Sequence, residues 1–133
     1  MTKSAIYTAL NTSSPVAVGS IIPLGTTIRR FGCNLVQEGN NIAIRGSGFY
    51  LASVSATVEP TAAGTVTIRL TKDGVDVPGG IASGVATAAG DPVNLSFAAI
   101  VRDLCGCVDS DLGLVLGGTD ATVTNLAVLV EKL

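Results

Sequence analysis

Hydrophobic and polar side chains alternate along much of this sequence, the pattern of strands that bury one face. The clearest run is residues 49–58, whose apolar members of one parity are Tyr50, Ala52, Val54, Ala56 and Val58. Residues 66–70 repeat the alternation, with Val66, Ile68 and Leu70 separated by Thr67 and Arg69. Both runs predict half-buried strands.

Turn residues separate these runs. Residues 60–64 supply Pro and Gly between the two strands, and Lys72-Asp73-Gly74 predicts a tight hairpin, because Asp and Gly tolerate positive φ. Further alternating runs cover residues 93–101 and 112–116. Since no segment of roughly ten residues shows helical periodicity, we predict an all-β fold, an antiparallel jelly-roll sandwich.

The C-terminal run, residues 121–133, is apolar on both faces. Leu126, Val128 and Val130 have one parity, whereas Ala127 and Leu129 have the other. In an antiparallel sheet, one apolar face meets the core and the other meets a second covering layer. A neighbouring subunit is the simplest candidate for that layer.

Composition also favours association. The chain has 133 residues, enough for one domain, and is 47% hydrophobic but only 14% charged. Its apolar residues are mainly Ala, Val, Leu and Ile, so a single subunit buries a core of small side chains. We expect residues 1–20 to form an N-terminal arm or terminal strand and residues 21–133 to form the jelly-roll domain.

Several partner classes and reactions are excluded. No apolar stretch reaches the length of a membrane span or a signal peptide, so we expect no membrane partner and synthesis in the cytoplasm. The net charge is −2 and Arg29-Arg30 is the only adjacent basic pair, which argues against nucleic-acid binding. The chain has no His, so the usual general base is missing and we expect no enzyme activity and no cofactor.

Three cysteines and a group of aspartates leave alternatives open. Cys33, Cys105 and Cys107 are interpreted as free thiols, as a disulfide between Cys33 and one of the pair, or as a metal site. The spacing does not choose among these. Asp103, Asp109 and Asp111 lack a spaced ligand loop, so a solvated acidic loop is favoured over an ion site.

Certain short stretches resemble a known family. Gly48-Phe49-Tyr50, the run of residues 66–70 into Lys72-Asp73-Gly74, and the apolar C-terminal strand resemble the trimeric tumour necrosis factor-like jelly roll. That fold is shared by complement-type heads and by the heads of collagen-like exosporium glycoproteins. Residues 28–34, 60–64 and 130–133 resemble small structural proteins of tailed bacteriophages.

This resemblance implies a virion protein: a homotrimer bound to the major capsid protein on the outer capsid surface as a decoration protein, or the receptor- or glycan-binding head of a fibre or spike. There is no collagen stalk or coiled-coil heptad ahead of the domain, which favours decoration. The expected trimer interface comprises Tyr50, Leu126, Val128 and Val130. The expected capsid anchors, in the arm, are Ile6, Tyr7 and Leu10.

Overall fold

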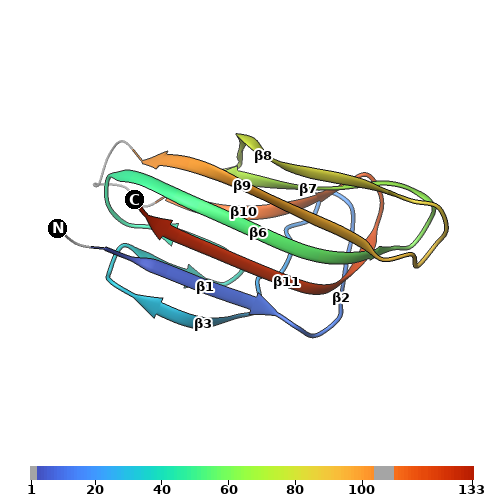
Figure 1. Ribbon diagram of the computed structural model, residues 1–133, viewed down its shortest axis with the longest axis horizontal. Helices are drawn as coiled ribbons and strands as arrows, with labels where there is room; N and C mark the ends of the chain where they lie inside the picture. Colours follow the sequence, from blue (N-terminus) through green and yellow to red (C-terminus); the bar gives the residue numbers. More distant parts are fainter. Residues whose placement is uncertain (1–2, 104–109) are drawn as a thin grey trace.

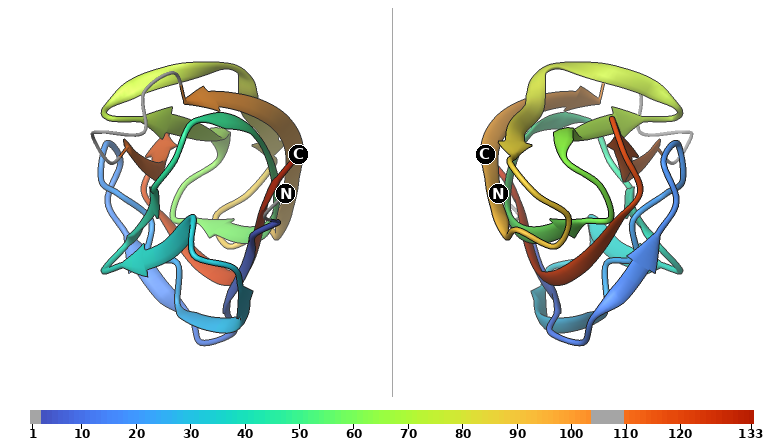
Figure 2. Two further views of the ribbon diagram at one scale, coloured as in Figure 1. Left: turned by 90° about the vertical axis from the view of Figure 1, so that its left-hand side faces the viewer. Right: turned by 90° about the vertical axis from the view of Figure 1, so that its right-hand side faces the viewer.

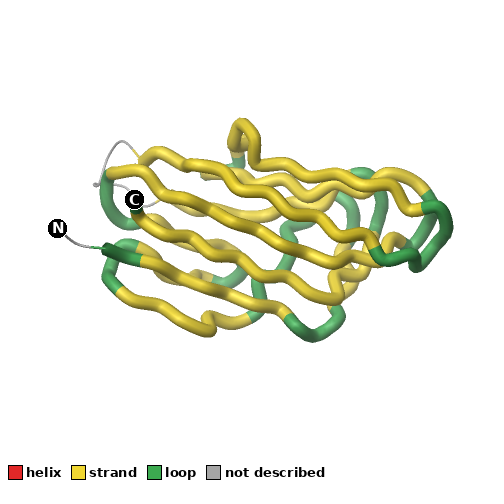
Figure 3. Tube along the Cα trace, viewed as in Figure 1, coloured by secondary structure: helices red, strands yellow, loops and turns green. Residues whose placement is uncertain are grey.

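The computed structural model describes residues 3–103 and 110–133, and this part of the chain consists of strands and loops (Figure 3). The all-β prediction is confirmed. No helix in the described ranges is long and apolar enough to cross a membrane. The strands are β1 (Ala5–Leu10), β2 (Ser14–Val16), β3 (Thr26–Phe31), β4 (Leu35–Glu38), β5 (Asn41–Ile44), β6 (Gly48–Pro60), β7 (Gly64–Lys72), β8 (Val75–Ala86), β9 (Val93–Asp103), β10 (Ser110–Gly117) and β11 (Ala121–Lys132).

These strands form two antiparallel sheets packed face to face (Figures 1 and 2). The front sheet has the order β3-β1-β11-β6-β9, with β2 also paired to β11, and the back sheet has the order β4-β5-β10-β7-β8. The predicted hairpin is confirmed: Asp73 and Gly74 connect β7 to β8 with φ values of 52° and 82°.

The core fills the space between the sheets and is built from alternate residues of each strand. Each long strand turns one parity inward, as the alternation predicts. Fully buried side chains from both sheets include Ile6, Tyr50, Leu126, Ile44, Ile68 and Leu114. Among the described residues, Tyr50 is the only aromatic side chain that is fully buried, and its hydroxyl donates a hydrogen bond to the Gly46 carbonyl at 2.8 Å. An aromatic ring is thus accommodated without an unpaired buried polar atom.

The first twenty residues form part of the sandwich. β1 lies between β3 and β11, and Ser4 and Thr8 occupy buried positions of the same parity as Ile6. Because these two core positions carry polar residues, the sequence of the segment does not show the apolar alternation of a buried strand, which is why an arm was predicted. The following loop is tied to the back sheet, since the amides of Gly19 and Ile22 donate to β10 at 2.7 and 2.8 Å. No separation between arm and domain occurs at residue 20.

Gly25 shows how closely the chain returns on itself after β2. Its φ is +81°, and a Cβ at this position would overlap the Ala9 carbonyl. Gly39, by contrast, has a φ of +63° with open space around it. The first glycine is therefore required by both backbone conformation and contact, and the second by backbone conformation alone.

Candidate interaction surface

The outer face of the front sheet carries a band of side chains that none of the described residues covers. Strand register aligns Tyr7 with Leu129, Leu129 with Ser53, and Ser53 with Ala98 across four neighbouring strands. The next row toward the centre of the sheet contains Ala9, Ala127, Ser55 and Ser96. We call these two rows the front face.

A shallow depression of about 520 Å³ lies on the front face. Its lining includes Tyr7, Ser53, Ser55, Ala98, Ala127 and Leu129. None of these side chains is charged, and the small ones allow another backbone to approach closely. The side chains of Tyr7 and Leu129 are 36% and 38% exposed, so a partner could bury further apolar area there.

The apolar surface continues toward the end of the sheet where β1 begins and β11 ends (Figure 1). The third row contains Leu51 and Ile100 together with Ala5 and one carboxylate, Glu131. Beyond it Phe49 lies beneath the Arg102 guanidinium at 5.6 Å. Ile100 is 57% exposed and Phe49 51% exposed. Exposed apolar side chains gathered on one face are typical of a protein interaction site.

The predicted trimer-interface residues lie on the opposite side of the same strands. Tyr50, Leu126, Val128 and Val130 are all buried in the core between the sheets, so they have no surface left for another subunit. The alternation along β11 was predicted correctly, but the parity of Leu126, Val128 and Val130 was expected at a subunit interface and instead faces the core. Ala127 and Leu129, the alternate residues of β11, face outward, and because both parities of β11 are apolar, its sequence alone does not distinguish the two faces.

The three predicted capsid anchors are separated by the pleat of β1. Ile6 is fully buried and Leu10 is partly buried against the core, so neither forms an exposed anchor. Only Tyr7 turns outward, onto the front face. An arm would expose all three, whereas a paired strand exposes alternate residues.

The predicted cysteine and aspartate groups are only partly described. Cys33 is exposed just after β3, and Cys105, Cys107 and Asp109 lie outside the described residues. Asp103 is buried, whereas Asp111 is exposed with its amide bonded to the Asp73 carboxylate at 2.9 Å. Within the described ranges, no three Cys, Asp or Glu residues lie close enough together to hold a metal ion.

A second, polar hollow of about 300 Å³ lies on the outer face of the back sheet. Its lining includes Ile21, Asn41, Arg69, Thr71, Asp111 and Gly113. Gly113 leaves room at its floor, because a Cβ there would lie 2.7 Å from the Asn41 amide oxygen. Arg69 contributes a cation that pairs with Asp76 at 3.3 Å. Sequence reasoning missed this hollow, whose residues come from separate strands.

Comparison with solved structures identifies the fold. Murine APRIL superposes with a TM-score of 0.73 at 11% identity, covering 98% of this chain and 99% of that chain. The globular domain of the zebrafish complement 1qA protein gives 0.71 at 13% identity, covering 97% and 95%. PRD1 vertex protein P5 gives 0.61 at 15% identity, covering 98% and 96%.

The chain therefore has a tumour necrosis factor-like jelly-roll fold, as the sequence resemblance implied. No family model matches it, and no curated protein matches it in sequence. At these identities the likeness establishes architecture, and function has to be argued from the surface of this chain.

Proposed function

We propose that this chain is a non-enzymatic structural protein of a virus particle, a homotrimer seated on the outer surface of the capsid that reinforces contacts between capsid subunits. The likeness to a viral vertex protein supports the virion part of the proposal. The front face supports the assembly part.

One observation carries the assembly argument: the front face is apolar, hollowed and uncovered in a subunit whose chain has few charges. A second copy that filled the depression would remove Tyr7 and Leu129 from water. Two front faces need not meet each other. A ring forms when the front face of each copy receives a different surface of the next, which is how cyclic trimers close.

The mass of the purified protein in solution tests this step. Light scattering after size-exclusion chromatography should give three times the chain mass of 13.3 kDa across a wide concentration range. A stable single subunit at every concentration would overturn the proposal, because the apolar face would then be tolerated in water.

The capsid placement has its own test. Electron microscopy of particles with and without this chain should show a difference in density on the outer capsid surface, at positions of threefold local symmetry. Capsids that lack this chain should disassemble at a lower temperature than capsids that carry it. Identical capsid surfaces in the two preparations would contradict the placement.

A receptor- or glycan-binding head is the alternative, and the polar hollow of the back sheet is the observation that favours it. Asn41, Arg69 and Asp111 offer both donors and acceptors beside the apolar Ile21, a combination that suits a sugar ring. A glycan array should then give hits that Asn41→Ala removes and the exposed, distant Thr61→Ala keeps. An array without hits would dismiss this alternative.

A further inference from the structure

Strand β3 is an exposed edge strand of the front sheet. It ends the front sheet, pairs only with β1 among the described strands, and all six of its residues are exposed. Side chains on its two faces include large apolar ones: Ile28 is 50% exposed and Phe31 is 60% exposed. Its outer edge thus presents unpaired backbone groups flanked by apolar side chains, which is where another strand can add to a sheet.

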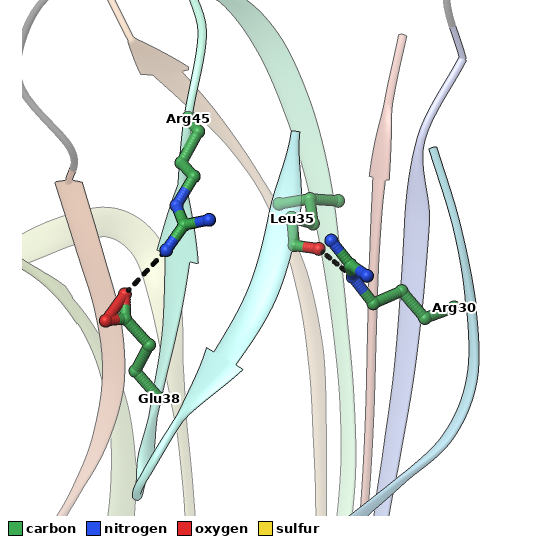
Figure 4. A network of polar contacts seen from close by, with 4 residues as sticks. All are labelled: Arg30, Leu35, Glu38 and Arg45. Carbon is green, nitrogen blue, oxygen red and sulfur yellow. Dashed lines mark hydrogen bonds and ion pairs between the residues drawn. The ribbon is translucent and has the colours of Figure 1, made fainter. Parts of the chain in front are cut away.

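The same strand concentrates positive charge. Arg29 has the parity of Phe31 and lies on the outer side of the sheet, opposite Tyr7. Arg30 has the other parity and donates through Nε to the Leu35 carbonyl on β4 at 2.5 Å (Figure 4). Lys3 is also exposed, and its carbonyl lies close to Gly32, just after the end of β3.

These cations have no carboxylate partners within the described part of the chain. Arg29 makes no ion pair there, and Arg30 makes only its backbone contact. Glu38, the acidic residue of the neighbouring β4, instead pairs with Arg45 at 3.6 Å (Figure 4). The β3 edge therefore carries two guanidinium groups that have no carboxylate partner among the described residues, and the geometry of a guanidinium suits a carboxylate.

We propose that the free edge of β3 binds an extended, acidic segment of a protein partner by strand addition. Main-chain hydrogen bonds would extend the front sheet, carboxylates would pair with Arg29 and Arg30, and apolar side chains of the segment would cover Ile28 and Phe31. Identifying that partner with the capsid protein rests on the proposed function; the binding itself does not.

Other occupants fit the edge less well. Nucleic acid requires more neutralised phosphates than Lys3, Arg29 and Arg30 supply, and the chain as a whole is acidic. A second copy pairing through its own β3 would bring four arginines together, which costs electrostatic energy. An acidic strand satisfies the charges, the backbone edge and the apolar side chains together.

Fluorescence anisotropy with a short labelled peptide, in which glutamate alternates with threonine and valine, tests the proposal on the full-length protein. We expect binding that salt weakens, and none for the same peptide with lysine in place of glutamate. The double variant R29E/R30E should bind at least about tenfold more weakly. R29K/R30K should retain most of the affinity, and Lys72→Glu, a charge reversal on β7 of the back sheet, should bind like wild type.

Amide hydrogen exchange separates strand addition from simple charge attraction. Bound peptide should protect amides within residues 26–31, and methylating alternate backbone nitrogens of the peptide should abolish binding. Equal binding by wild type and R29E/R30E, no binding by the acidic peptide, or binding without added protection would each overturn the proposal.

Rival occupants have distinct outcomes in the same experiment. Displacement of the peptide by single-stranded DNA, or a change in assembly mass caused by R29E/R30E, would replace the acidic segment with nucleic acid or a second copy. A monomeric wild type that still binds the peptide would defeat the proposed trimer while leaving this inference standing.

Discussion

Tyr7 and Leu129 lie directly opposite each other on β1 and β11, and both turn away from the core onto the front face. The pair joins two strands from opposite ends of the sequence into one apolar surface. We predict that Leu129→Glu reduces the assembly to single subunits without unfolding them, because a buried charge without a partner opposes contact between copies. Light scattering measures the mass and circular dichroism the fold. Ser83→Glu, on the outer face of the back sheet, should leave the mass unchanged.

Ile6→Ala tests whether the N-terminal segment belongs to the core. Because Ile6 is fully buried, the truncation should lower the free energy of unfolding by about 2–4 kcal/mol, measured by denaturant titration. Lys3→Ala, at an exposed position of the same segment, should change it by less than about 0.5 kcal/mol. Similar losses of unfolding free energy for the two variants would show that the N-terminal segment contributes little to the core and behaves as an arm.

Gly25 and Gly39 form a matched pair for backbone constraint. Gly39→Ala should cost about 1–2 kcal/mol, the penalty of placing a Cβ at positive φ in open space. Gly25→Ala adds an overlap with the Ala9 carbonyl and should cost more than about 3 kcal/mol or prevent folding. Thermal unfolding of both variants decides this, and equal losses would show that the turn relaxes freely.

Tyr50 makes stability depend on alkaline pH. Burial of the ring, and then the negative charge of Asp103, raise the pKa of the hydroxyl above its ordinary value of 10.0, while a hydrogen bond with Asn34 opposes them. Above pH 10 the unfolded chain loses this proton more readily than the folded one, so stability is complete below that pH and falls as the pH rises toward the folded-state pKa.

Tyr50→Phe should remove this alkaline slope, at a cost of about 1 kcal/mol at neutral pH for the hydrogen bond to Gly46. Denaturant titrations of both proteins from neutral to alkaline pH provide the comparison. The same slope in wild type and variant would show that another group is responsible.

Sequence periodicity predicts most of this fold, because strand pleating converts burial directly into alternation. In β6, β7 and β9 the residues that face the core are almost all apolar, and they alternate with exposed or partly exposed residues. β1 does not show this pattern, because Thr8 within the strand and Ser4 just before it are polar residues at core positions, so the strand is recognised only from its pairing with β3 and β11. For the surface, periodicity showed that β11 is apolar on both faces but gave no information about which parity faces the core.

The β3 edge illustrates the remaining gap. Its sequence contains the adjacent pair Arg29-Arg30 and two large apolar residues, Ile28 and Phe31. From the sequence, one such pair indicates only that the chain lacks the cluster of cations that nucleic-acid binding requires. Their significance depends on β3 ending a sheet and on Glu38 being paired elsewhere. Neither fact is local in sequence.

The pairing of β1 with β11 also constrains how the protein is made. Ala5 faces Glu131, so β1 cannot complete its pairing until residues 121–132 have been synthesised. Contacts so distant in sequence are slow to form. Until β11 is added, the facing edges of β1 and β6 have no partner strand, and such open edges expose a newly made chain to aggregation.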